Sequence, residues 1–295
     1  QIKGRKPTET RWQLTLDLTN PLVCEFIYKS VADILKNTNI QYVKWDYNRN
    51  MSEAGSPSLS AKCQREVDFR YYLGLYSVLE RLNNDFPDVL FESCSGGGGR
   101  FDAGMMYYFD QYWTSDDSDA VERLYIQHGT SVVMPSIFMG AHVSGVPSHH
   151  TGRMTSLRYR GDVAMCGRFG YELNITKMTD EELKEVEGQI ERYKEIEDIV
   201  HFGDMYRLVS PFESDSTVWQ YISEDKKTVV LACYRIMRHP DTFAGMIKAQ
   251  GLDENADYRL RGTEKVFSGT VLMNYGIQFP VKKSFESEIM IFDKI

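Results

Sequence analysis

The stretch YVKWDYNR, residues 42–49, has the pattern of a β-strand that ends on charged side chains. Tyr42 and Val43 are residue types that favour strands, and Lys44 and Asp46 follow two positions apart. Side chains two apart in a strand point to the same side of the sheet. We therefore expect the Lys44 ammonium to lie beside the Asp46 carboxylate and to keep it ionised, as a nucleophile requires. The alternative is a structural ion pair that caps the strand.

Short apolar runs alternate with helical patterns over the first two-thirds of the chain. We expect strands at residues 13–18, 42–45, 89–92, 111–114 and 131–134, and a mixture of helix and loop over 151–170. This alternation is typical of βαβ units that build a parallel sheet. Polar residues follow the strands, and both a (β/α)8 barrel and a doubly wound sheet bind their ligands at that end. The pattern alone leaves both architectures open.

Helix boundaries are marked by capping residues. Thr19 or Asn20 is a suitable N-cap before Pro21, and Thr179 with Glu182 forms a capping box that predicts a long helix. The apolar residues expected on the inner faces of three helices are Val23, Ile27, Val31 and Ile34; Leu75, Val78, Leu79 and Leu82; and Leu183, Val186, Ile190 and Tyr193.

From about residue 205 the pattern changes to successive strands without an intervening helix. We expect these strands at residues 217–222, 227–234, 257–261, 269–273 and 288–293, separated by Gly, Asp and Asn. Such a series predicts a small antiparallel β-sandwich. The predicted organisation is an α/β domain over residues 1–204 and a β-sandwich domain over residues 205–295.

The composition argues against several classes of protein. A net charge of −8 over 295 residues disfavours nucleic-acid binding, and no run of 18 apolar residues predicts a membrane span. The polar start shows no signal peptide, and a first residue other than Met suggests a piece of a longer protein. Five cysteines, an odd number without a CxxC spacing, disfavour a disulfide framework or a zinc site and favour a reducing, cytoplasmic setting.

The stretch TSDDSDA, residues 114–120, places three carboxylates directly after a predicted strand. Crowded carboxylates raise one another's pKa, which suits a general acid. The alternative is a helix N-terminus, where the helix dipole favours acidic residues. Asp119 has the position of the cap, so Asp116, nearest the strand, is the better catalytic candidate.

Two further motifs contain polar or small residues that could bind a ligand. ESCSGGGGR, residues 92–100, lacks the lysine of a P-loop and the spacing of a dinucleotide fingerprint, but its glycines would allow a ligand to approach the backbone closely. Cys94 has no neighbouring histidine that would support a thiol nucleophile. We expect His142, His149 and His150 to form hydrogen bonds within a loop rather than to bind a metal. We expect neither a metal ion nor a cofactor.

Two carboxylates at strand ends of one sheet are what a glycosidase requires. One attacks the anomeric carbon. The other protonates the leaving oxygen and then acts as the base for water. This hypothesis rests on the residues alone.

Four long motifs together resemble the catalytic domain of glycoside hydrolase family 36, the microbial α-galactosidases. They are YVKWDYNRN (42–50), ESCSGGGGRFDAGMMYY (92–108), YWTSDDSDAVERLYIQHGTS (112–131) and MGAHVSGVPSHHTGR (139–153). The resemblance implies a (β/α)8 barrel followed by a C-terminal β-sandwich. It also implies retaining hydrolysis of terminal α-1,6-galactosides such as melibiose or raffinose, in an enzyme that is often a tetramer.

The resemblance assigns roles to individual residues. Asp46 would be the nucleophile and Asp116 the acid/base. The residues that would contact or enclose the galactose are Arg11, Lys44, Asn48, Cys94, Gly97 and Trp113.

The sequence also departs from the family pattern. The N-terminal β-sandwich of the family, its first barrel strands and its WFDDGW-like motif are not found among these residues. The family layout would start this chain just before the third barrel strand, so we expect the first strands to be missing. Two alternatives stay open, namely galactosyl transfer of the raffinose or stachyose synthase type and an inactive sugar-binding fragment.

Overall fold

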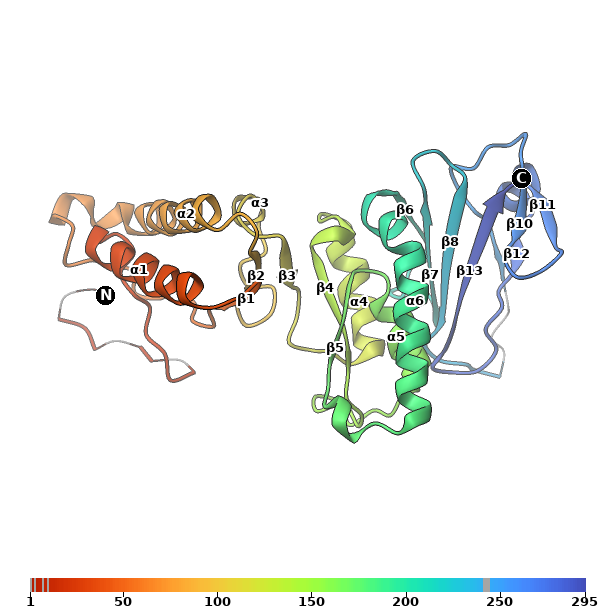
Figure 1. Cartoon of the computed structure of the whole chain (residues 1–295), viewed down its shortest axis with the longest axis horizontal. Helices are drawn as coiled ribbons and strands as arrows, with labels where there is room; N and C mark the ends of the chain where they lie inside the picture. The colour runs from red at the N-terminus through yellow and green to blue at the C-terminus, as the bar shows by residue number, and fades with distance from the viewer. Residues whose placement is uncertain (1, 3, 7, 10, 241–244) are drawn as a thin grey trace. The chain divides into compact units, whose positions relative to one another are not determined.

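The computed structural model describes residues 2, 4–6, 8–9, 11–240 and 245–295 and forms two compact units, Gln1–Asp116 and Asp117–Ile295 (Figure 1). Each unit contains parallel strands connected through helices. None of the helices in this described part of the chain is both long and apolar enough to cross a membrane.

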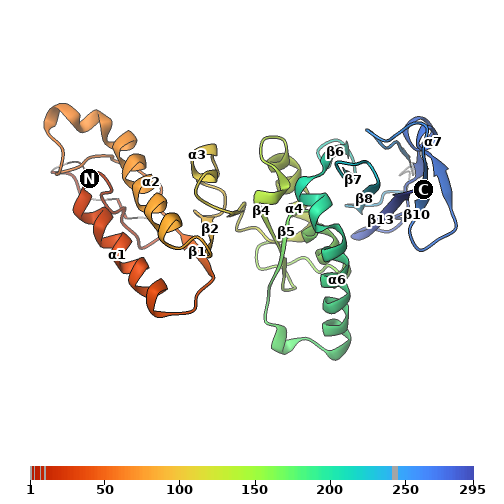
Figure 2. The same ribbon diagram turned by 45° about the horizontal axis from the view of Figure 1, so that its top comes forward.

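The first unit is built on three parallel strands. The chain runs through α1 (Pro21–Asn37), β1 (Tyr42–Asp46), a 3-10 helix (Ala61–Glu66), α2 (Val67–Asp85), β2 (Leu90–Cys94), α3 (Ala103–Met106) and β3 (Gln111–Trp113). β2 lies between β1 and β3 and pairs with both. Helices α1 and α2 lie side by side in both ribbon views (Figures 1 and 2). The predicted strand–helix alternation is confirmed here.

Helix α1 begins as its sequence predicts. The Asn20 side chain accepts a hydrogen bond from the backbone N–H of Leu22, and Pro21 follows at the first helical position. Its buried face differs from the prediction by one position, because Cys24, Ala32 and Leu35 are buried while Ile34 is exposed. In α2 the predicted inner residues Leu75, Val78, Leu79 and Leu82 are all buried.

The second unit contains two further parallel strands and a large antiparallel sheet. Its first part consists of α4 (Ala120–Ser131), a 3-10 helix (Ser136–Phe138), β4 (Met139–Ser144), α5 (Leu157–Ala164), β5 (Arg168–Glu172), a 3-10 helix (Ile175–Lys177) and α6 (Asp180–Phe202), with β4 and β5 paired in parallel. The capping box of Thr179 and Glu182 opens α6 as predicted.

The antiparallel region forms a six-stranded sheet in the order β11-β10-β13-β8-β7-β6. Its strands are β6 (Asp204–Val209), β7 (Ser216–Ile222), β8 (Thr228–Arg235), β10 (Asp257–Leu260), β11 (Val266–Ser268) and β13 (Glu286–Lys294). A two-stranded sheet of β9 (Met246–Ile247) and β12 (Ile277–Gln278), together with the helix α7 (Gly269–Asn274), completes the region.

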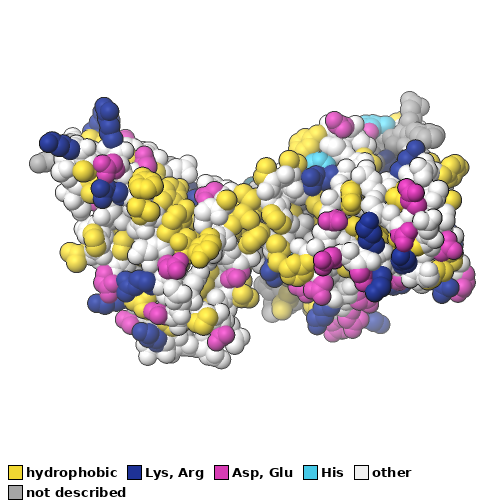
Figure 3. Space-filling view, turned by 90° about the horizontal axis from the view of Figure 1, so that it is seen from above, with side chains coloured by type: hydrophobic (Ala, Val, Ile, Leu, Met, Phe, Trp, Pro, Cys, Tyr) yellow, Lys and Arg dark blue, Asp and Glu magenta, His cyan; other side chains and the backbone are white. Residues whose placement is uncertain are grey.

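Both faces of β7 and β8, in the six-stranded sheet, are buried. Trp219 and Tyr221 of β7 pack into a core shared with α4, α5 and α6, whereas the alternating Val218 and Ile222 pack toward α7, β9 and β12. This explains why every residue of β7 is buried and why its sequence lacks the alternation of a half-exposed strand. Hydrophobic side chains also reach the surface of both units (Figure 3).

Several predicted elements are wrong. Residues 14–17 have no regular secondary structure, and residues 132–134 form a turn and a bend before the actual strand β4. Residues 269–273 belong to helix α7 instead of a strand, because the Ser268 side chain caps its first turn by accepting from Val271 N–H. Strand β5 was missed, since it lies in the stretch expected to contain only helix and loop.

Strand β1 is also less buried than its sequence suggests. Its residues alternate between exposed and half-buried. Within the part of the chain that the structure describes, β1 is an edge strand that pairs only with β2. An edge strand has one covered side and one open side, so an apolar sequence does not ensure burial there.

Asp162 of α5 provides a test of the packing between α5 and the sheet. Its carboxylate is buried, accepts a 2.7 Å hydrogen bond from the Ser287 hydroxyl and lies 3.7 Å from Arg158 Nε. Burial raises the pKa of Asp162 from 3.8 to about 6. The folded protein therefore binds this proton more tightly than the unfolded chain, and the free energy of unfolding falls as the pH rises from about 4 through about 6.

Asp162→Asn should remove this loss of stability. The variant is expected to be more stable than the parent above pH 6 by about 1–3 kcal/mol, and the difference should vanish near pH 4. Denaturant unfolding at both pH values measures it. Asp33→Asn, at an exposed position of α1, serves as the control. A difference that did not change with pH would contradict the prediction.

Candidate active site

The three strands of the first unit place the predicted site residues at one edge of their sheet. Asp46 is the last residue of β1 and pairs in register with Cys94, the last residue of β2. Trp113 ends β3, and Asp116 follows three residues later. Because the strands are parallel, their carboxyl ends meet at the same edge. This is the edge at which the sequence predicted a site.

The glycine-rich loop after β2 packs directly against the backbone that carries Asp116. Gly97 has φ +78°, and a Cβ there would lie 2.7 Å from Ser115 Cα and 2.9 Å from the backbone N of Asp116. A Cβ at Gly98 would lie 2.6 Å from the carbonyl oxygen of Thr114. No side chain fits in either place, so glycine is required for this approach.

The other side of the same loop is bound to the segment that follows Asp46. The backbone N–H of Gly96 donates a 2.7 Å hydrogen bond to Asn48 Oδ1. The backbone N–H of Tyr47 donates a 2.9 Å hydrogen bond to the carbonyl oxygen of Cys94. The loop thus connects the segment of Asp46 on one side with the segment of Asp116 on the other.

Arg11 lies beside Asp116. Its Nη1 is 3.9 Å from Asp116 Oδ2, and a Cβ at Gly96 would lie 3.3 Å from the same nitrogen. Both side chains are about half exposed. The structure therefore brings a cation, the glycine loop and one of the two predicted catalytic carboxylates together at an open edge.

The ion pair of Lys44 differs from the sequence-based expectation. Lys44 Nζ lies 3.3 Å from Glu92 Oε1, so its ion pair is with Glu92 and not with Asp46. The register explains this, because Lys44 and Glu92 are direct partners across β1 and β2. The ammonium also lies 4.6 Å from the centroid of the Trp113 ring, and Trp113 is only 3% exposed.

Cys94 is not suited to nucleophilic attack. Burial, together with the negative charge of Asp46, raises the pKa of its thiol to about 11 against opposing effects of the Gly97 backbone and Lys44. The thiol is therefore protonated at neutral pH. The thiol lies near Asp46, Lys44 and Gly97.

Asp119 has the structural role that the sequence predicted. It caps α4 by accepting from the backbone N–H groups of Val121 and Glu122, at 2.9 and 3.2 Å. Burial opposes its ionised form, but hydrogen bonds from Thr151 and from these N–H groups hold the pKa of Asp119 below its usual value. Asp117 is half-buried and accepts a hydrogen bond from the backbone N–H of Asp119, so Asp116 is the exposed carboxylate of this cluster.

The three histidines do not form a metal site. His149 and His150 contact each other with ring centroids 3.9 Å apart, and His150 Nδ1 lies 3.8 Å from Asp117 Oδ1. His142 Nδ1 lies 4.0 Å from Glu172 Oε2. Among the described residues, no group of three or more His, Cys, Asp or Glu side chains lies close enough together to hold a metal ion.

Two charged residues that support the site were missed in the sequence. The Arg100 guanidinium is buried 3.5 Å from the Tyr47 ring centroid and donates to Ser95 Oγ at 3.2 Å and to the Arg49 carbonyl at 3.1 Å. It braces the glycine loop against the segment after Asp46. Glu92, the partner of Lys44, is the second. Glu92 and Arg100 begin and end the motif ESCSGGGGR, but only the strand register and the course of the glycine loop show what they contact.

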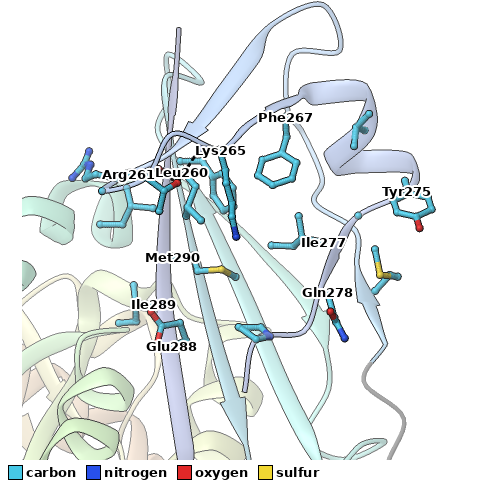
Figure 4. Close-up of a pocket in the computed structure, with 18 of the residues that line it drawn as sticks. Leu260, Arg261, Lys265, Phe267, Tyr275, Ile277, Gln278, Glu288, Ile289 and Met290 are labelled. Atoms are coloured by element: carbon cyan, nitrogen blue, oxygen red, sulfur yellow. Dashed lines mark hydrogen bonds between the residues drawn. The ribbon is translucent and has the colours of Figure 1, made fainter. Parts of the chain in front are cut away.

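Two cavities contain at most one of the predicted site residues each. A cavity of about 850 Å³ in the second unit is lined by apolar side chains such as Phe267, Ile277 and Met290, with Arg261 and Lys265 near them (Figure 4). It contains none of the predicted site residues. A cavity of about 240 Å³ between β1, α1 and α2 reaches Asp46. Most of its lining is apolar, and Tyr47, Tyr71, Ser93 and Arg100 add polar groups.

Gly97→Ala tests the close approach of the loop. The variant is expected to lose at least about 2 kcal/mol of unfolding free energy, because a positive φ strains an alanine and the Cβ collides with backbone. Gly129→Ala in α4 is the matched control, since nothing lies within 4 Å of its added Cβ, and it should be neutral or up to about 1 kcal/mol stabilising. Equal denaturant midpoints for both variants would contradict the geometry.

Comparisons with known proteins place the chain in a family. Residues 1–203 match the family model Melibiase, and residues 216–292 match the model of the Glycosyl hydrolase family 36 C-terminal domain. The chain is 46% identical to the α-galactosidase AgaA of Geobacillus stearothermophilus over 96% of its own length. It is 41% identical to the α-galactosidase Mel36A of Lactobacillus acidophilus over 100% of its own length. It spans only 39% and 40% of these two relatives.

Solved structures show the same fold. A crystal structure of AgaA in complex with raffinose superposes on 100% of the chain with a TM-score of 0.96 and 44% identity, and the chain covers 41% of that structure. The galactosidase domain of AgaSK gives a TM-score of 0.94 at 39% identity, again over 100% of the chain and 40% of that structure. The predicted fold class, a partial (β/α)8 barrel followed by an antiparallel β region, is confirmed. The chain belongs to glycoside hydrolase family 36, of which it carries the C-terminal part of the catalytic barrel and the C-terminal β domain.

Proposed function

We propose that this chain supplies the two catalytic carboxylates of a retaining α-galactosidase. The observation that carries the proposal is the placement of Asp46 and Asp116 on the two sides of one glycine loop, at the carboxyl ends of parallel strands. Membership of family 36 supports the same activity. The substrates we propose are terminal α-1,6-galactosides of the melibiose and raffinose type, because related enzymes have been solved with raffinose and stachyose bound.

The proposed mechanism has two displacement steps. Asp46 attacks the anomeric carbon and forms a C–O bond to galactose, while Asp116 gives its proton to the leaving glycosidic oxygen. The Asp116 carboxylate then removes a proton from water, and the water oxygen attacks the anomeric carbon. The bond to Asp46 breaks, its carboxylate is restored, and galactose leaves with its original α configuration. No metal or cofactor takes part in this scheme.

The remaining site residues are proposed to bind the sugar. Lys44, Arg11 and the amide NH₂ of Asn48 can donate hydrogen bonds to hydroxyl groups, and they cannot accept a proton from them. Cys94 and Gly97 would form the wall next to Asp46. The Trp113 indole is covered by Lys44 in this structure. We propose that the indole forms the wall of the sugar-binding site beneath Lys44.

We also propose the broader setting of the chain. Its domain boundary is placed between residues 204 and 205, supported by the two family models, which end at residue 203 and begin at residue 216. The thiols of all five cysteines are free, which supports a reducing, cytoplasmic location. A homo-oligomer, a tetramer in the family pattern, is proposed from the resemblance alone.

Transfer of galactose to another sugar is the main alternative. The first displacement step would be the same, and a sugar hydroxyl would replace water in the second. Analysis of the products formed with sucrose as an added acceptor separates the two, because a synthase yields raffinose while a hydrolase yields free galactose. Assay of residues 1–295 alone on a chromogenic α-galactoside tests the further alternative of an inactive sugar-binding fragment.

Replacing Asp46 tests the nucleophile. In the full-length protein, Asp46→Ala is expected to lower kcat on an aryl α-galactoside at least about 10³-fold, because no covalent intermediate forms. Stability should change by less than about 0.5 kcal/mol, since the side chain is exposed. Asp33→Ala, an exposed carboxylate of α1, should keep full activity. Parental turnover in Asp46→Ala would refute the proposed mechanism.

The acid/base role of Asp116 is tested through the leaving group. Asp116→Ala should lower kcat/KM on melibiose about 10²- to 10⁴-fold, because the departing sugar needs a proton. The loss should be much smaller for a dinitrophenyl α-galactoside, whose leaving group departs without one. If both substrates lost activity equally, Asp116 would not be the general acid.

A further inference from the structure

A buried carboxylate on the central strand of the first unit has no place in the mechanism above. Glu92 of β2 is 1% exposed, and charged side chains are rarely buried without partners. Its Oε1 lies 3.3 Å from Lys44 Nζ. Its Oε2 accepts a 2.9 Å hydrogen bond from Gln111 Nε2 and another from the Tyr42 hydroxyl.

The strand register fixes these contacts. Lys44 of β1 and Gln111 of β3 are both direct partners of Glu92, one on either side. Asp46 and Cys94, the next pair on the same face of β1 and β2, lie two residues further toward the carboxyl end. Glu92 therefore lies one layer beneath the candidate nucleophile and directly beside the lysine proposed to contact the sugar.

The contacts restrict where the Lys44 ammonium can go. A lysine side chain has a flexible four-carbon stem and loses rotamer entropy when it is fixed. Glu92 holds the ammonium on one side, and the Trp113 ring lies 4.6 Å from it on another. The Lys44 side chain is still 37% exposed, so its ammonium can reach a ligand from this fixed position.

We propose that Glu92 is a positioning residue, which holds the Lys44 ammonium in place for the galactoside before the substrate binds. This inference rests on the proposed function, because it assigns to Lys44 a contact with the sugar. A carboxylate that fixes the lysine in advance removes the entropy cost of ordering it at the moment of binding. The charge of Glu92 is the property that acts on the ammonium, whereas the Gln111 amide and the Tyr42 hydroxyl are neutral donors.

Glu92→Gln in the full-length protein removes this charge and keeps the size of the side chain. We expect KM for melibiose to rise and kcat/KM to fall on the order of 10- to 100-fold, because the ammonium is no longer fixed. Glu92→Asp keeps the charge but shortens the side chain, and it should give an intermediate KM. Asp162→Asn, which removes an equally buried carboxylate of the second unit, should leave KM unchanged.

A double-mutant cycle with Lys44→Met shows whether Glu92 acts through Lys44. In the Lys44→Met background, adding Glu92→Gln should cause no further loss of kcat/KM, because the group that it positions is gone. Independent, additive losses would overturn the inference and would make Glu92 a purely structural brace. A purely structural role would also lower the Tm and the active fraction without raising KM.

The outcomes also separate this inference from the proposed function. If Asp46→Ala is inactive while Glu92→Gln and Glu92→Asp both keep the parental KM and kcat, the inference fails and the enzyme assignment stands. If Asp46→Ala keeps parental activity, the assignment itself fails. Should Glu92→Gln not fold, Glu92→Asp decides the question, since a parental KM in that variant contradicts positioning by this carboxylate.

Discussion

The candidate site depends on the close contact between the glycine-rich loop and the backbone that follows β3. Gly97 and Gly98 approach Ser115, Asp116 and Thr114 so closely that no Cβ could be accommodated. Without this contact the segments of Asp46 and Asp116 would be separate loops after separate strands. The glycines allow two stretches that are distant in the sequence to lie at one edge of the sheet. Arg100 holds the other side of the loop by donating to Ser95 Oγ.

The charges of the first unit are arranged in two layers with different environments. Asp46, Asp116 and Arg11 lie at the open edge, where solvent and a ligand can reach them. Glu92 lies two residues before the carboxyl end of β2. It is buried and contacts Lys44 of β1 and Gln111 of β3. A buried charge is costly unless it is paired, and Glu92 pairs with Lys44, which lies two residues before Asp46 on β1.

In the second unit, the central strands of the antiparallel sheet are buried on both faces, so their sequences lack the alternation of a half-exposed strand. Residues of β7 and β8 pack toward α4–α6 on one side and toward α7, β9 and β12 on the other. Both alternating sets are therefore mainly apolar. The prediction of strands at residues 217–222 and 227–234 is confirmed, whereas residues 269–273 are a helix, because the Ser268 cap outweighs the strand-forming tendency of its apolar residues.

The sequence by itself determined the alternation of strands and helices in the first unit, the caps of α1 and α6, and the motifs that identify the family, because these depend on local periodicity and on residue types at fixed spacing. Only the tertiary structure decided that Lys44 pairs with Glu92 instead of Asp46, and that the edge strand β1 is half open. Strand register and loop contacts join residues about fifty positions apart. They follow from the packing of the whole unit, and no local pattern of residues contains that information.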